Sequence, residues 1–274
     1  DTANDITFKN IKTHGAGQDG IYVSYKCYQV RILECDSYDN AGSGITTYAD
    51  YAGHGSATIA GSICHENRRN GILIDSNVYA PGEEINIFSS LIYGNDWNGI
   101  AGRWTILSLS NATVADNGGG FYTSYTDHET HIYNCIISSN LNYGIFDRSE
   151  QGIVTDYNDL YSNQIDYGGA ASAGPHSFSS DPMFNNQTGR DYSLKDSHSP
   201  CYRAGSIRFA PQKDCRGEDF SDPPNVGAFA GIAGFTPTPG PPTPSLTVTP
   251  IPTATRPPTP SPTASPTATP PIPT

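Results

Sequence analysis

Most side chains that could carry out acid–base or sugar chemistry lie in five short segments, residues 47–51, 75–79, 102–104, 122–129 and 146–150. Elimination from a uronic acid polymer needs a cation that neutralises the sugar carboxylate and a base that removes the neighbouring proton. Arg103 and Arg148 are the candidate cations, and His128 or Tyr125 is the candidate base. No other Lys or Arg occurs in these segments, which weakens the case for a groove that grips an anionic polymer.

Carboxylates in the same segments suggest two further kinds of chemistry. Hydrolysis of a glycosidic bond needs two carboxylates, one on either side of the bond. Asp50, Asp75 and Asp147 are candidates, although acids on a surface are more often simply solvated. Calcium prefers carboxylate oxygens, so Asp75, Asp127 and Asp147 would form a weak calcium site if they converge. No other cofactor is expected.

Aromatic side chains are frequent in the five segments and could stack on sugar rings, because each has a flat apolar face and a polar edge. The candidates for glycan stacking are Tyr48, Tyr51, Tyr79, Trp104, Tyr122 and Tyr125. The alternative is that some of these rings stack on one another between neighbouring structural repeats. Catalysis, sugar binding and a purely structural role therefore remain open at this point.

An internal repeat indicates how these segments are positioned. A Gly followed by Ile or Phe recurs at positions 20, 44, 71, 99, 120 and 144, with steps of 24, 27, 28, 21 and 24 residues. From the second unit on, an Asn stands four residues before the Gly, or three in one case: Asn40, Asn67, Asn95, Asn117 and Asn140. Asn163 continues this series beyond the last Gly, and the first unit has Ala16 in its place. A period of this length is typical of a solenoid. Including a first unit that starts near Ile6, we count seven coils.

Apolar residues occupy equivalent positions in successive repeats. One column reads Val30, Ala57, Ile85, Leu107, Thr130 and Ile153, and a second, two residues later, reads Ile32, Ile59, Ile87, Leu109, Ile132 and Thr155. Alternate residues of a strand point to the same face, so each unit is predicted to contribute strands with an apolar inner face. A third column of small residues, predicted to line a corner, reads Cys35, Ser62, Ser90, Ala112, Cys135 and Asn158. Asn and Gly corners suit left-handed backbone angles.

This pattern resembles the right-handed parallel β-helix family of secreted polysaccharide lyases, some glycoside hydrolases and bacterial surface proteins. The resemblance implies an all-β solenoid over residues 1–170, with any active groove on one outer face. Residues 180–184 (SDPMF), 191–194 (DYSL) and 225–229 (NVGAF) are similar to the closing segment of anchored β-helix surface proteins. That resemblance implies an irregular cap over residues 171–235 that covers the last coil.

The cysteines favour neither a metal site nor a single disulfide pattern. They are too widely spaced for a CxxC site, and no His stands at ligand spacing from them. Cys201 and Cys215 form the most plausible local disulfide, whereas Cys35, Cys64 and Cys135 fit better as small buried side chains.

Composition separates the last 39 residues from the rest of the chain. Residues 236–274 contain 15 of the 22 prolines, 12 threonines and a single charge, Arg256. Such a tail cannot bury a core and is expected to adopt polyproline II. Its candidate O-glycosylation sites are Thr238, Thr243, Thr259 and Thr263. The proline-free run Ser245, Leu246, Thr247, Val248 and Thr249 could add as a strand to an open sheet edge.

The remaining 235 residues carry 14 basic and 27 acidic side chains, an excess of negative charge that disfavours nucleic-acid binding. No apolar run is long enough for a membrane span. Two interpretations follow for a secreted or cell-surface protein. The first is a structural subunit of a fibre or surface assembly, built by head-to-tail self-association and tail contacts and possessing no catalytic activity. The alternative is a carbohydrate-active protein, a polysaccharide lyase or a module that binds or hydrolyses glycans or the cell wall, on a Pro/Thr stalk.

Overall fold

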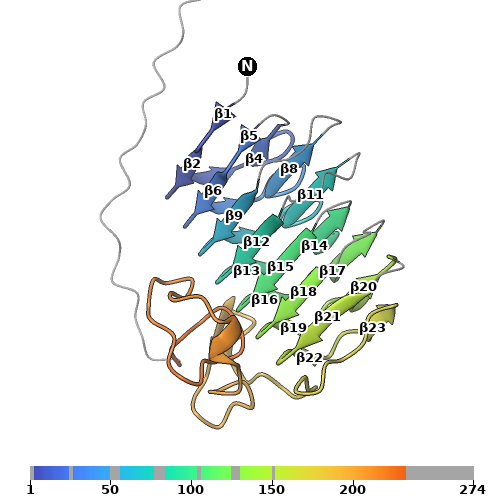
Figure 1. Ribbon diagram of the computed structural model, residues 1–274, viewed down its shortest axis with the longest axis vertical. Helices are drawn as coiled ribbons and strands as arrows, with labels where there is room; N and C mark the ends of the chain where they lie inside the picture. Colours follow the sequence, from blue (N-terminus) through green and yellow to red (C-terminus); the bar gives the residue numbers. More distant parts are fainter. Residues whose placement is uncertain are drawn as a thin grey trace, which may run out of the picture. The chain divides into compact units, whose positions relative to one another are not determined.

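The computed structural model describes residues 3–24, 27–49, 56–76, 84–103, 106–124, 130–149 and 152–232. Each sequence repeat forms one coil of three short strands, and equivalent strands of successive coils pair in parallel (Figure 1). The result is three parallel sheets with seven strands each. The predicted β-helix of about seven coils is therefore confirmed.

The three sheets are named here by their order within a coil. Sheet 1 consists of β2 (Thr7–Lys9), β6 (Val30–Leu33), β9 (Ala57–Ala60), β12 (Glu84–Phe88), β15 (Ile106–Ser110), β18 (Thr130–Tyr133) and β21 (Ile153–Asp156). Sheet 2 consists of β3 (Lys12–His14), β7 (Asp36–Tyr38), β10 (Ile63–His65), β13 (Leu91–Tyr93), β16 (Thr113–Ala115), β19 (Ile136–Ser138) and β22 (Asp159–Tyr161). Sheet 3 consists of β4 (Ile21–Val23), β8 (Ile45–Ala49), β11 (Ile72–Ser76), β14 (Asn98–Arg103), β17 (Gly119–Ser124), β20 (Tyr143–Asp147) and β23 (Ile165–Gly169).

Four strands and one short helix lie outside these sheets. β1 (Ala3–Asn4) pairs in parallel with β5 (Cys27–Tyr28). In the C-terminal part, β24 (Phe184–Asn186) and β25 (Asp191–Leu194) form an antiparallel hairpin. A single turn of 3₁₀ helix spans Ile207–Phe209.

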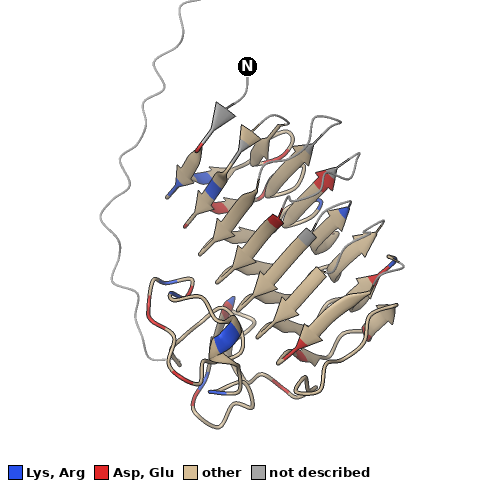
Figure 2. Ribbon diagram, in the orientation of Figure 1, with Lys and Arg blue, Asp and Glu red and all other residues tan. Residues whose placement is uncertain are grey.

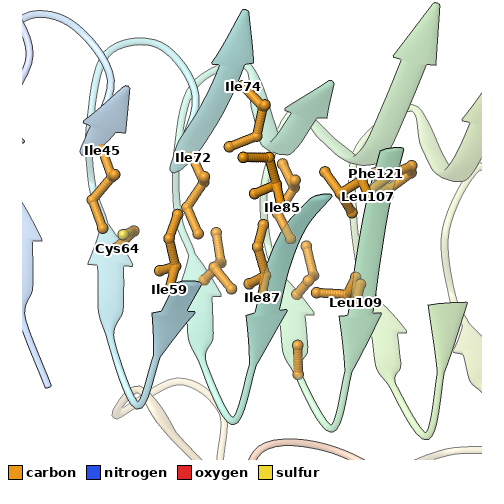
Figure 3. Close-up of a cluster of buried hydrophobic side chains, with 14 of the residues drawn as sticks. Ile45, Ile59, Cys64, Ile72, Ile74, Ile85, Ile87, Leu107, Leu109 and Phe121 are labelled. Carbon is orange, nitrogen blue, oxygen red and sulfur yellow. The ribbon is translucent and has the colours of Figure 1, made fainter. Parts of the chain in front are cut away.

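The core consists of the apolar columns that the repeat predicts. Ile59 pairs in register with Ile32 and with Ile87, and Ile72 pairs with Ile45 and with Ile100. These six side chains are fully buried, and Figure 3 shows Ile45, Ile59, Ile72 and Ile87 directed into the interior of the solenoid. Because each unit exposes one apolar face, stacking of like residues on like residues removes that face from water.

The Asn series forms a continuous side-chain ladder along one corner. The Nδ2 of each Asn donates to the Oδ1 of the Asn in the next coil, at 2.9 Å from Asn40 to Asn67, 2.9 Å from Asn67 to Asn95 and 2.8 Å from Asn95 to Asn117. The same Oδ1 atoms also accept the backbone N–H of the preceding Asn, at 3.0 to 3.2 Å. A buried corner thereby satisfies backbone groups that no strand partner reaches.

Left-handed backbone angles occur one residue earlier than the sequence pattern suggests. The residues with positive φ are those that precede the ladder, for example Asp39 at 51°, Glu66 at 54° and Asp116 at 56°. At the ladder position itself, the Asn side-chain amide is needed for the hydrogen bonds between coils. The small-residue column is arranged in the same way, since the Ser62 hydroxyl accepts the N–H of Cys35 at 3.2 Å.

The C-terminal part of the chain has two roles. Residues 170–178 cross the last coil, where Thr155 Oγ1 donates to the carbonyl of Ser172 at 2.6 Å and Phe178 N donates to Asn158 O at 2.9 Å. Residues 184–232, here called the C-terminal segment, instead pack on the outer face of sheet 2, as Tyr192 does against Tyr93. The implied cap over the last coil is thus only the first part of this region.

Candidate functional site

The predicted chemical residues that the structure describes lie on sheet 3, toward the C-terminal ends of its strands. Asp75 in β11 pairs in register with Tyr48 in β8 on one side and with Arg103 in β14 on the other. Arg103 in turn pairs with Ser124 in β17. Since Ile74 points inward, its neighbour Asp75 points outward, and the row Tyr48, Asp75, Arg103, Ser124 runs across the outer face.

Asp75 and Arg103 form an ion pair between adjacent coils. The Nε of Arg103 donates to Oδ1 of Asp75 at 2.7 Å, and the guanidinium NH2 contacts the same oxygen. The side chains are 43% exposed for Arg103 and 19% exposed for Asp75. In Figure 2 the red end of β11 lies beside the blue end of β14. The charge of Arg103 is therefore partly neutralised before any ligand arrives.

Asp147 does not belong to this outer face, which corrects the sequence prediction. It pairs in register with Thr123, and both side chains are buried on the inner face of sheet 3. Its Oδ1 accepts the N–H of Ser149 at 2.7 Å, and its Oδ2 has no hydrogen-bond partner. Asp147 can therefore act neither as a catalytic carboxylate of the groove nor as a partner of Asp75 in hydrolysis.

The predicted calcium site fails for the same geometric reason. Asp75 and Asp147 lie on opposite faces of one sheet, so their oxygens cannot converge on one ion. Asp127, the third predicted ligand, lies outside the described residues. Across the described ranges, no group of three His, Cys, Asp or Glu side chains is arranged to hold a metal.

Other predicted residues lie outside the described part of the chain: Asp50, Tyr51, Tyr79, Trp104, Tyr125 and His128. The same holds for the tail, residues 236–274, with its predicted glycosylation and strand-addition positions. Arg148 is exposed, and its backbone N–H donates to Thr123 O at 2.9 Å. Among the described candidates, the structure brings together Tyr48, Asp75 and Arg103 and places Tyr122 on the same face.

Tyr122 belongs to an aromatic cluster that the sequence analysis identified only in part. Its ring is nearly parallel to that of Phe146, with an interplanar angle of 14° and centroids 6.3 Å apart, and Tyr143 lies 5.1 Å from Phe146. Phe146 leans over Gly168, where a Cβ would come within 2.6 Å of its ring. Gly168 in β23 pairs in register with Phe146 in β20 and so occupies the same outward column. A Gly at this position, one coil after a Phe, is the sequence signal that could have revealed the aromatic cluster.

The contacts of Tyr122 agree in part with the alternative interpretation of the aromatic residues, in which rings of neighbouring coils stack on one another instead of on a sugar. A face-to-face stack would place the centroids about 3.5–4 Å apart, as seen for Tyr133 and Phe209 at 3.8 Å. At 6.3 Å the rings of Tyr122 and Phe146 are strongly offset, so much of each face stays uncovered by the other. Tyr143 is anchored separately: its hydroxyl donates to Asn98 Oδ1 at 2.6 Å, and burial raises its pKa to about 12.

The predicted Cys201–Cys215 disulfide is not formed, and both residues are free thiols. Cys201 is buried beside Ile136 and donates from Sγ to Asp159 Oδ2 at 3.0 Å, whereas Cys215 packs in the cluster around Tyr93 and Tyr192. Each sulfur is therefore held in a different cluster under the C-terminal segment. Cys35, Cys64 and Cys135 are buried as predicted.

Sheet 2 shows how the outer face of a sheet can be occupied by structural contacts instead. Its column of rings, His14, Tyr38, His65 and Tyr93, stacks with centroid distances of 5.0, 4.8 and 4.7 Å and interplanar angles of 13° or less. Among the described residues, the C-terminal segment continues this column through Tyr192. In the view of Figure 1, the C-terminal segment, in orange, lies on the side of the solenoid opposite to β11, β14 and β17.

Comparison with known proteins identifies the class of fold. The profile of the family "Right handed beta helix region" matches residues 1–111. Together with the three parallel sheets, this match defines the protein as a right-handed parallel β-helix. No curated protein matches the chain.

Two solved structures are similar to the chain. The A-module of the mannuronan C-5 epimerase AlgE4 from Azotobacter vinelandii is 20% identical, with a TM-score of 0.45, and the match covers 65% of this chain and 58% of that one. The pectate lyase Pel9A is 17% identical, with a TM-score of 0.48, and the match covers 82% of this chain and 65% of that one. The chain thus spans less than two thirds of the length of either structure.

The described residues contain no helix long and apolar enough to cross a membrane.

Proposed function

We propose that this chain is a carbohydrate-active protein that binds an acidic polysaccharide along the outer face of sheet 3. The observation that carries the proposal is the offset pair Tyr122 and Phe146, which lies on the same face as the Asp75–Arg103 ion pair. Tyr122 pairs with Ala101, two residues before Arg103, so the rings and the guanidinium lie diagonally across neighbouring strands. Parallel offset rings suit sugar rings, and a guanidinium suits a carboxylate.

The group that we expect to meet the carboxylate of a uronic acid polymer is the guanidinium of Arg103. It lies on this face already paired with Asp75. A guanidinium held by a neighbouring carboxylate has a fixed orientation, so less conformational entropy is lost when it meets a substrate carboxylate. Because polymers of this kind are extracellular material, the proposal implies a site of action outside the cell.

The reaction that we propose for this face is β-elimination. A cation at the uronate carboxylate increases the acidity of the neighbouring carbon-bound proton, and a base removes that proton. The electron pair forms a carbon–carbon double bond as the glycosidic oxygen leaves and takes up a proton. The bases predicted from the sequence, His128 and Tyr125, lie outside the described residues, so the proposal assigns Arg103 alone a role in this step.

Affinity electrophoresis in gels that contain pectate, alginate or hyaluronan, with neutral xylan and glucan gels alongside, tests the binding. We expect retardation in at least one acidic gel and a loss of it in Phe146→Ala. Tyr161→Ala, a half-buried tyrosine of β22 in sheet 2, is the matched control and should be retarded like the unsubstituted protein. Unsaturated products in the same polymers, followed by ultraviolet absorbance, would extend binding to elimination.

The ion pair provides a second test, because two substitutions should act in opposite directions. Asp75→Asn removes the negative charge that faces Arg103 and should tighten binding of the acidic polymer about 3-fold, whereas Arg103→Gln should weaken it by a similar factor. If both substitutions have no effect, or if no acidic polymer retards the protein, the proposal is wrong. Filaments in negative-stain microscopy of such an inactive protein would instead favour the structural-subunit interpretation.

A further inference from the structure

A cleft of about 470 Å³ lies between the outer face of sheet 1 and the C-terminal segment. Phe88 and Ser110 line it on the side of the solenoid, and residues 208–213 line it on the side of the segment. This volume falls within the range of about 300–1,000 Å³ that is usual for small-molecule sites. The cleft belongs to a different sheet from the face on which the proposed function rests.

A change of side-chain size along one outward row of sheet 1 forms the floor of the cleft. Phe88 pairs in register with Ser110, and Ser110 pairs with Tyr133. The residue before each of the three is fully buried, so the three side chains point outward. Strands of neighbouring coils are about 4.8 Å apart, so the two aromatic residues are about 10 Å apart along the row. Between them the row offers only the small side chain of Ser110.

Phe209 lines the cleft from the C-terminal segment and is held in place by two contacts. Its ring lies within 8° of parallel to that of Tyr133, with the centroids 3.8 Å apart. The guanidinium of Arg208 lies over the Phe209 ring, 5.4 Å from its centroid. Ala210 and Pro211 extend the apolar lining. The aromatic part of the cleft is therefore already in position before a ligand binds.

The charged side chains that line the cleft are both cations. Arg208 and Lys213 belong to the lining, and none of the described Asp or Glu residues does, although acidic residues outnumber basic ones by 27 to 15 in the chain. Lys213 Nζ is paired with Asp219 Oδ1 at 2.7 Å. Within the described part of the chain, the guanidinium of Arg208 contacts the ring of Phe209 and forms no ion pair. The cleft therefore favours an anion and offers it an uncompensated guanidinium.

The electrostatic attraction extends over a short distance only. A second hollow, toward the second and third coils, shares Phe88 and Lys213 with the cleft. Its lining also includes Glu34 and Asp214. A polymer of uronates that ran along both hollows would place carboxylates beside these two acids, where like charges repel. The charge pattern therefore suits one small anion instead of an acidic polysaccharide.

The uncharged lining favours an aromatic ring over a sugar ring. Ser110 and Gln212 are its only hydrogen-bonding side chains without charge among the described residues. Most hydroxyls of a sugar would face apolar groups without a partner, which costs free energy. An aromatic ring needs no such partners, and pairs of aromatic rings attract each other in offset or edge-to-face contacts.

We propose that this cleft binds a small aromatic carboxylate. Its carboxylate pairs with the guanidinium of Arg208, and its ring packs against Phe88 and Phe209 above Ser110. A guanidinium matches a carboxylate with two parallel hydrogen bonds, which fixes the orientation of the ligand. The site goes beyond the proposed function and uses none of its residues.

Ligand-observed NMR titration of the full chain tests the site, with cinnamate and benzoate as probes and with cinnamyl alcohol and glucuronate as comparisons. We expect saturable binding of at least one aromatic carboxylate and weaker binding of both comparison compounds. Arg208→Gln should weaken the binding about 10-fold, because it removes a charged hydrogen-bond donor. Lys195→Gln is the matched control: it removes another exposed cation of the C-terminal segment, outside the lining, and should leave binding unchanged.

A substitution that fills the cleft provides an independent test. Ala210 lies in the lining but outside the solenoid, so Ala210→Trp should abolish binding of the carboxylate without changing the melting temperature of the coils. Binding that persists in a folded Ala210→Trp would place the ligand elsewhere and overturn the inference.

Three other results would also overturn it. They are the absence of saturable binding with both aromatic carboxylates, equal affinity for cinnamyl alcohol, and an affinity for glucuronate that exceeds the affinity for cinnamate. The two proposals fail separately. Arg208→Gln should leave the retardation in acidic gels unchanged, whereas Phe146→Ala should leave the binding of the aromatic carboxylate unchanged.

Discussion

Removal of one amide from the middle of the asparagine ladder is expected to destabilise the solenoid strongly. Asn95 is 2% exposed and has contacts in three coils. Its Nδ2 donates to Asn117 Oδ1 at 2.8 Å and to the carbonyls of Cys64 and Tyr93, both at 3.1 Å. Its Oδ1 accepts both Nδ2 and the backbone N–H of Asn67, at 2.9 and 3.1 Å.

Asn95→Ala leaves two buried donors of Asn67 without their acceptor, while Asn117 Oδ1 still accepts the N–H of residue 95. An orphaned buried donor costs about 1–3 kcal/mol, so the free energy of unfolding should fall by about 2–5 kcal/mol. In a body of this size each kcal/mol lowers the melting temperature by about 2–4 °C. We expect a decrease of about 5–15 °C in differential scanning calorimetry.

The matched control is Asn142→Ala, which removes an exposed amide from the equivalent corner of the sixth coil. Its melting temperature should stay within about 2 °C of the unsubstituted protein, because surface substitutions usually change stability by less than about 0.5 kcal/mol. If the melting temperature of Asn95→Ala is also within about 2 °C of the unsubstituted protein, the ladder is not a stabilising element.

Three further predictions concern the interior. Ile87→Ala, at a fully buried position in the middle of sheet 1, should lower the free energy of unfolding by about 2–5 kcal/mol in urea denaturation, and an effect below 1 kcal/mol would indicate a loosely packed core. Burial raises the pKa of Asp159 to about 6, above its value in the unfolded chain, so the protonated carboxyl favours the folded state at low pH and this contribution to stability is lost as the pH rises from about 4 to 6. The melting temperature should therefore fall less over this pH range in Asp159→Asn than in the unsubstituted protein. An equal fall of the melting temperature with pH in both proteins would contradict the assignment. Burial also raises the pKa of Cys64 and, to about 12, that of Cys135, so iodoacetamide should modify these thiols only after denaturation, and rapid labelling of either in the folded protein would contradict their placement.

Prediction from the sequence was most complete where the repeat imposes its own register. The columns through Ile59 and Ile72 pair as predicted, because a solenoid stacks equivalent residues on one another and spacing alone identifies the partners. The Asn ladder follows from the same rule. The position of the left-handed residue was shifted by one, because the ladder requires a side-chain amide whereas its predecessor requires only the backbone angle.

The candidate site was less predictable, since one residue along a strand changes the face on which a side chain lies. Asp75 and Asp147 have similar positions in their segments, yet Asp75 points outward to Arg103 and Asp147 points into the interior. Tyr143 and Phe146 were missed because their rings are positioned by glycines of neighbouring coils, Gly119 and Gly168, which are distant in the sequence.

The sequence by itself determined the coil, because repeated apolar and Asn positions allow only one way of stacking that buries them all. It also separated the acidic body from the Pro/Thr tail by composition. Only the tertiary structure decided which outer face is covered and how the cysteines are used. Those outcomes depend on where the C-terminal segment packs: it places Tyr192 on the ring column of sheet 2 and holds Cys201 against Asp159. Contacts between a non-repeating segment and the solenoid have no periodic signature, so no spacing in the chain predicts them.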